Sequence, residues 1–135
     1  MSSAFPYEAT TRGICVRVAP RFLEDDSNPE LHRFLWAYHI RIENHGQLEV
    51  QLRDRHWIIT DAQGRMEEVR GEGVVGQQPV IAAGEAYDYV SACPLTTPSG
   101  MMQGSYGMVD SHGLLFQVDI PAFSLDSPYD QRAIN

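Results

Sequence analysis

The sequence contains no lysine. All ten basic residues are arginines, and the acidic residues, aspartate and glutamate, number 18. The formal net charge is therefore -8 and the isoelectric point lies near 4.9. A general nucleic-acid binder needs a basic face for phosphate contacts, whereas the summed field of this chain repels polyanions. The composition argues against general nucleic-acid binding and leaves only a local basic patch as a route to phosphate.

Long apolar runs and a secretion signal are also missing. No stretch of about eighteen apolar residues occurs, and the N-terminal residues form neither a basic nor an apolar segment, so we expect no membrane contact and a cytoplasmic protein. The only two cysteines, Cys15 and Cys93, flank Trp36 in a spacing that loosely imitates a secreted immunoglobulin domain. Because Ser91 replaces the tyrosine expected two places before the second cysteine, free thiols are predicted.

Patterns typical of catalytic and metal sites are absent as well. The five histidines show no H-x-H or H-E-x-x-H spacing, and the cysteines form no C-x-x-C pair. The acidic segment 24–30 does not match a calcium-binding loop, so a solvated turn is favoured over a cation site. Glu67 and Glu68 are neighbours on a predicted strand and face opposite sides, which is wrong for a shared acid and base. We predict no enzyme activity, no cofactor and no bound metal.

What the sequence does contain is alternation with a period of two. The clearest run spans 34–44, where Phe34, Trp36, Tyr38, Ile40 and Ile42 share one face. Residues 44–47 are typical of a hairpin turn into a strand with Val50 and Leu52 on its apolar face. That pairing predicts a polar patch formed by His39, Arg41, Glu43, Gln51 and Arg53. A slip of the apolar phase further predicts a bulge between Arg53 and His56.

Seven or more short strands, with turn residues roughly every ten positions and no helical periodicity, predict an all-β fold. The expected architecture is an antiparallel, immunoglobulin-like β-sandwich. We expect one domain over residues 1–135, with an N-terminal arm at 1–11 and a flexible tail at 127–135. Trp36 and Trp57 should lie in or beside the core.

One stretch, Arg70 to Pro79, has a pattern that could name a ligand. Gly71, Gly73 and Gly76 follow the G-x-G-x-x-G spacing of dinucleotide-binding units. Such units need a helix after the glycines, and Pro79 prevents one, so we predict a loop between strands. Loop amides can still form an anion nest. The candidate anion-binding residues are Arg70, Gly71, Gly73 and Gly76, with Arg53 and Arg55 as charge partners.

Several motifs together resemble the bacterial ApaG family, and the resemblance extends from about Val16 to Leu125. The segments that carry it are 36–44, 50–52, 55–64, 71–79 and 97–106. The resemblance implies a fibronectin type III-like β-sandwich and a link to cobalt resistance and magnesium efflux. Related domains in larger eukaryotic proteins resemble protein-interaction modules. The glycine motif of the family, here Gly71, Gly73 and Gly76, has prompted a pyrophosphate-binding proposal.

Two functions remain open. The first is a non-enzymatic module that binds a protein partner through loops or edge strands. The alternative is a sensor of nucleotide or pyrophosphate at the glycine-rich loop, residues 71–76. Because Glu72 lies inside that loop and the net charge is -8, we expect any nucleotide binding to be no tighter than about millimolar.

Overall fold

The computed structural model describes residues 4–130. This part of the chain contains nine β-strands, two short 3-10 helices and no α-helix. The elements in chain order are β1 (Tyr7–Thr11), β2 (Ile14–Phe22), η1 (Glu24–Asp26), η2 (Pro29–Leu31), β3 (Phe34–Asn44), β4 (Val50–Asp61), β5 (Met66–Glu72), β6 (Val80–Ile81), β7 (Ala86–Leu95), β8 (Gly100–Asp110) and β9 (Leu115–Leu125).

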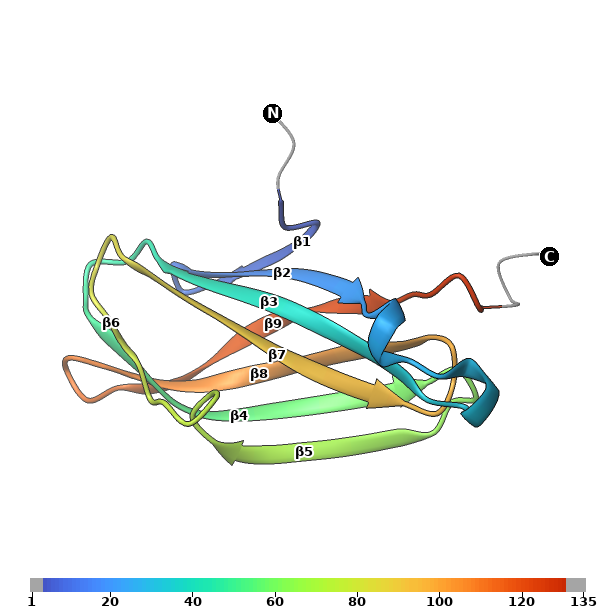
Figure 1. The fold of residues 1–135 in the computed structure, drawn as a ribbon. Coiled ribbons are helices and arrows are strands. Elements are labelled where there is room, and N and C mark those ends of the chain that lie inside the picture. The colour runs from blue at the N-terminus through green and yellow to red at the C-terminus, as the bar shows by residue number, and fades with distance from the viewer. Residues whose placement is uncertain (1–3, 131–135) are drawn as a thin grey trace.

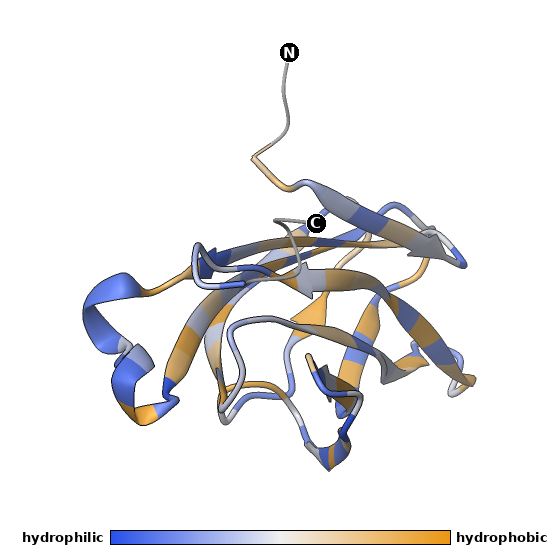
Figure 2. Ribbon diagram, turned by 90° about the vertical axis from the view of Figure 1, so that its right-hand side faces the viewer, coloured by the Kyte–Doolittle hydropathy of each residue, from blue (hydrophilic) through white to orange (hydrophobic). Residues whose placement is uncertain are grey.

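The strands form two antiparallel sheets packed face to face (Figure 1). One sheet has the order β1-β2-β3-β7, and the other has the order β5-β4-β8-β9, with β6 pairing on β4. Apolar and polar positions alternate along the strands, as the colouring in Figure 2 shows. The apolar faces meet in one core, so the predicted antiparallel β-sandwich is confirmed.

The structure confirms which side chains of β3 face the core. Its even-numbered side chains are buried and its odd-numbered ones are partly exposed along the whole strand. Trp36 and Trp57 are 1% and 3% exposed, which confirms that both lie in the core. A bulge is also present, but it lies just before the predicted interval: the register of β4 against β8 shifts between Leu52 and Asp54, so Arg53 is the inserted residue.

The predicted hairpin between β3 and β4 is wrong, because the two strands belong to different sheets. Asn44 is buried and does not serve as an exposed turn residue. Its side-chain Nδ2 donates to the carbonyls of Leu48 (2.9 Å) and Ile81 (3.0 Å). These bonds hold a connection that crosses from one sheet to the other. The polar patch predicted from the hairpin therefore divides: His39, Arg41 and Glu43 lie on one sheet, and Gln51 and Arg53 on the other.

The predicted N-terminal arm is also partly wrong, because residues 7–11 form strand β1 on the edge of β2. The two strands join through Arg12 and Gly13, which both have positive φ (51° and 81°), as a two-residue hairpin requires. An arginine rarely takes that conformation, so the turn gave no clear signal in the sequence.

The start of the predicted C-terminal tail is ordered. Ser127 Oγ donates to the Pro98 carbonyl (2.6 Å), and the Tyr129 ring packs on the core beside Phe22 and Phe34. The tail prediction is therefore wrong for 127–130, and its remainder, 131–135, lies outside the described residues.

Candidate binding groove

The glycine-rich stretch forms a strand end and a tight turn. Gly71 is part of β5, and the chain then turns so that Val74 and Gln77 exchange two backbone hydrogen bonds of 2.8 and 2.9 Å. Val75 and Gly76, at the centre of this turn, have φ values of 42° and 80°. The loop predicted here, without a helix, is confirmed.

Much of the backbone that an anion nest would need is already bonded within the protein. The Gly73 amide donates to the Arg53 carbonyl (2.9 Å), and the Val74 amide donates to Gln77. Arg55 Nη1 donates to the carbonyls of Glu72 and Gly73, both at 2.9 Å. Arg55 therefore holds the loop in place, with its guanidinium directly against the Gly71 backbone.

The candidate anion-binding residues do not all meet. Arg55, Gly71 and Gly73 are in contact, as described above. Arg70 belongs to the opposite face of β5, because it pairs with Glu68 (3.3 Å), which also binds His56 (2.7 Å). His56 alternates with the buried Trp57 and so points away from the core.

The remaining two candidates, Arg53 and Gly76, are exposed. Arg53 is exposed at the bulge. Gly76 is exposed at the tip of the turn, with open space at its Cβ position, and it lines the same hollow as Arg55. The structure thus places Arg55 and two of the glycines together and separates them from Arg70.

Two hollows lie between β5 and β7. One has a volume of about 620 Å³ and the other about 510 Å³. They share three lining residues, Ile59, Glu67 and Pro94, and therefore form one continuous surface. We call this surface the β5–β7 groove. Its other central lining residues are Leu35, Val69, Cys93 and Leu95.

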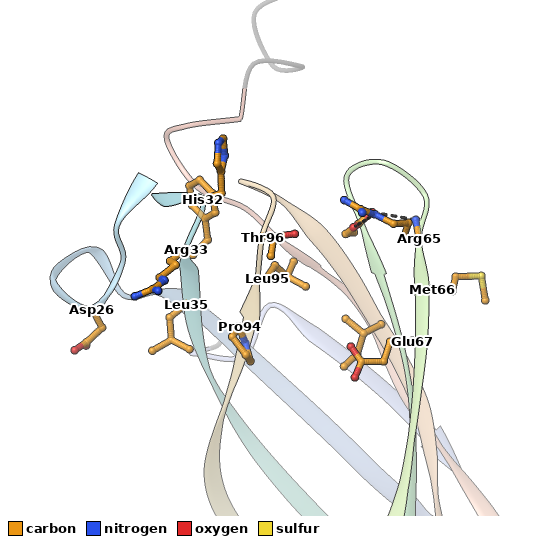
Figure 3. Close-up of a pocket in the computed structure, with 13 residues that line it drawn as sticks. Asp26, His32, Arg33, Leu35, Arg65, Met66, Glu67, Pro94, Leu95 and Thr96 are labelled. Carbon is orange, nitrogen blue, oxygen red and sulfur yellow. Dashed lines mark hydrogen bonds and ion pairs between the residues drawn. The ribbon is translucent and has the colours of Figure 1, made fainter. Parts of the chain in front are cut away.

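The groove has an apolar floor and a free carboxylate. Ile59, Val69 and Leu95 are partly buried against the core. Glu67 forms no ion pair or hydrogen bond within residues 4–130, and in Figure 3 its carboxylate points into the hollow while Met66 points away. Arg65, on the rim, is occupied by Asp61 (3.1 Å). The sequence had placed Glu67 and Glu68 on opposite faces, but it gave no sign that Glu67 would face a groove.

Two polar side chains of the groove lining, Tyr89 and Cys93, are buried. Tyr89 and Tyr106 share a buried hydrogen bond between their hydroxyls (2.5 Å), and burial raises the pKa of both phenols. Burial also raises the pKa of the Cys93 thiol to about 11. A neutral thiol is a poor nucleophile. Cys15 and Cys93 are free, as predicted.

A network of charges crosses the outer face of the other sheet, around Glu43. Arg41 Nε and His45 Nε2 each lie 2.9 Å from its carboxylate, and Arg17 Nε lies 3.2 Å from it. Partial burial alone would raise the pKa of Glu43, but the hydrogen bonds with His45 and Arg41 and the nearby charge of Arg17 outweigh it and lower the pKa to about 2.

This network predicts a pH dependence of stability. A carboxyl group whose pKa is depressed by folding stabilises the protein above its ordinary pKa, near 4.5, and loses that contribution as the pH falls towards about 2. The wild type should therefore have a higher urea midpoint than Glu43→Gln at neutral pH, and the difference should narrow below about pH 4.5. A difference that stays constant across this range would show that the charge of Glu43 is not what stabilises the fold.

Within residues 4–130, no group of three or more histidine, cysteine, aspartate or glutamate side chains is placed to hold a metal ion. None of the helices in this part of the chain has the length and apolar character needed to cross a membrane.

Comparison with known proteins decides the family. The family model described as the ApaG domain matches residues 24–110. The chain belongs to the ApaG family. Protein ApaG of Rhodospirillum centenum is 60% identical over 129 residues, which cover 96% of this chain and 99% of that protein. Protein ApaG of Brucella anthropi is 56% identical over the same length and coverage.

Solved structures of similar chains share the fold. A crystal structure of a protein from Bordetella pertussis is 44% identical and covers 93% of this chain and 100% of its own, with a TM-score of 0.84. The family resemblance predicted from the motifs is therefore confirmed over nearly the whole ApaG chain, including both strands that border the groove.

Proposed function

We propose that this ApaG protein is a non-enzymatic module that binds a protein partner in the β5–β7 groove. The observation that carries the proposal is the groove itself, in which apolar side chains lie between two edge strands. Edge strands and apolar clefts are surfaces to which extended segments of other proteins commonly add. The neutral thiol and phenols at its back supply no activated nucleophile, which supports binding as the role.

The alternative function, a nucleotide or pyrophosphate sensor, has weaker support. It would use the loop at residues 71–76, where the Gly73 amide and Arg55 Nη1 already bond to backbone carbonyls. The link to cobalt resistance and magnesium efflux, implied by the family resemblance, fits a partner-binding module if the partner carries the ion chemistry. The free thiols Cys15 and Cys93 support a cytoplasmic location, where cysteines stay reduced.

A substitution inside the groove tests the proposal. Val69→Arg places a charge among the apolar lining residues, and it should reduce capture of the native partner from a lysate by about tenfold or more. The matched control is Leu115→Arg, at a leucine that is 71% exposed on β9. Retained proteins would be quantified by mass spectrometry after both variants are shown to be folded. Equal capture by the two variants would refute the groove as the binding surface.

A further inference from the structure

Within residues 4–130, the second edge of β7 pairs with no strand and borders the groove, and the hydrogen-bond pattern shows which of its backbone groups are unpaired. The Asn44 amide donates to the Glu85 carbonyl (2.9 Å), so the even-numbered residues of β3 bond towards β7. In the register of the two strands, Ile40 lies opposite Tyr89 and Tyr38 opposite Ser91. The odd-numbered residues of β7 therefore bond to β3, and the even-numbered ones direct their backbone groups to the open side.

Pro94 agrees with this assignment. Proline has no amide hydrogen and is confined in sheets to positions where the nitrogen faces away from the neighbouring strand. Pro94 is even-numbered, so its nitrogen faces the open edge, where no hydrogen is needed. The backbone groups of Asp88, Val90 and Ala92 are left available, and Pro94 ends the available segment.

The inner face of the other sheet continues past β7. In Figure 1, β5 lies beyond β7 at the lower edge of the sandwich. A strand added beside β7 would consequently lie over β4 and β5 and would direct alternate side chains onto Ile59, Glu67 and Val69. The groove has the shape of a missing fifth strand of the β1-β2-β3-β7 sheet.

The charges of the groove indicate what this strand should carry. Glu67 stands at the junction of the two hollows with no cationic partner in the described chain. Two of the three arginines in the lining are occupied, since Arg55 binds two carbonyls and Arg65 binds Asp61. Arg33, which is exposed, lies at the far end near η2. A net charge of -8 also attracts a basic partner.

We infer that the β5–β7 groove binds an extended peptide segment that pairs with the free edge of β7 and places a lysine or arginine side chain on Glu67, between apolar side chains that fill the two hollows. This inference rests on the proposed function and specifies the chemistry of the partner. Pairing through backbone groups supplies affinity, and the alternate side chains supply selectivity.

Two synthetic peptides test the inference. Each alternates valine with threonine, and one carries lysine and the other glutamate at the central position of the valine series. Titration of isotope-labelled protein, followed by amide chemical shifts, gives the site and the affinity. The lysine peptide should shift the amides of Asp88, Val90 and Ala92, and it should bind at least about fivefold more tightly than the glutamate peptide.

Substitution of the two neighbouring glutamates assigns the charge preference. Glu67→Gln should abolish the difference between the peptides, whereas Glu68→Gln, on the opposite face of the same strand, should retain it. Equal affinity of the two peptides for the wild type would overturn the inference, as would the absence of saturable shifts at the β7 edge. Neither result would bear on the proposed function, which the capture experiment with Val69→Arg tests separately.

Discussion

Replacing Trp36 by alanine is expected to lower the free energy of unfolding by about 3–5 kcal/mol. The indole is 1% exposed, its ring lies 5.4 Å from that of Phe22, and its Nε1 donates to the Asp126 carbonyl (2.8 Å). Truncation removes buried apolar surface, opens a cavity that the surrounding strands cannot close, and leaves the Asp126 carbonyl without this donor. Urea unfolding followed by circular dichroism measures the change.

Leu115→Ala is the control for this prediction. Leu115 is 71% exposed, so its truncation should change the free energy of unfolding by no more than about 0.5 kcal/mol. A Trp36→Ala protein with the denaturation midpoint of the wild type would contradict the assignment of the inner face of β3.

Replacing Gly73 by alanine is expected to cost about 2–4 kcal/mol. Gly73 has a φ of 63°, and a Cβ atom at this position would lie 2.2 Å from the Gln77 carbonyl oxygen. Backbone on the far side of the turn would have to move, and the bonds between Val74 and Gln77 would be strained with it. Thermal unfolding, with the amide spectrum of residues 73–78, reports both the loss of stability and its location.

Gly76→Ala separates the clash of an added Cβ atom from the cost of a positive φ. Gly76 has a φ of 80° but no neighbouring atom within 4 Å of its Cβ position, so only the positive φ opposes alanine, at about 1 kcal/mol. The two glycines belong to the same sequence motif. Equal costs at both positions would show that the close approach of Gly73 to Gln77 is not what requires glycine there.

The strands of this fold could be predicted because their signal is local. Every second residue of β3 is buried, and the phase slip at Arg53 marks the bulge. The connection after β3 could not be predicted in the same way. Asn44 and Gly46 suit a hairpin turn and an inter-sheet crossing equally well, and the choice depends on the distant Ile81 carbonyl that Asn44 binds. A hydrogen bond between residues far apart in the sequence therefore determines the path of this connection.

In the candidate site, too, local features could be predicted and long-range ones could not. The glycine spacing and Pro79 correctly predicted a loop without a helix, because both act on the local backbone. The groove depends instead on how far β5 extends past β7, and these strands do not pair with each other. Glu67 and Glu68 look alike in the sequence. Only the fold shows that Glu68 binds His56 outside while Glu67 faces the groove.

Site-specific photo-cross-linking tests the central claim, that a protein partner binds in the β5–β7 groove, most directly. A benzophenone amino acid would replace Val69 in the groove in one protein and Leu115 on β9 in another, and each would be irradiated in living cells. We expect a discrete cross-linked protein product from position 69 and none from position 115. Products from position 115 alone, or no product from either position, would contradict the account.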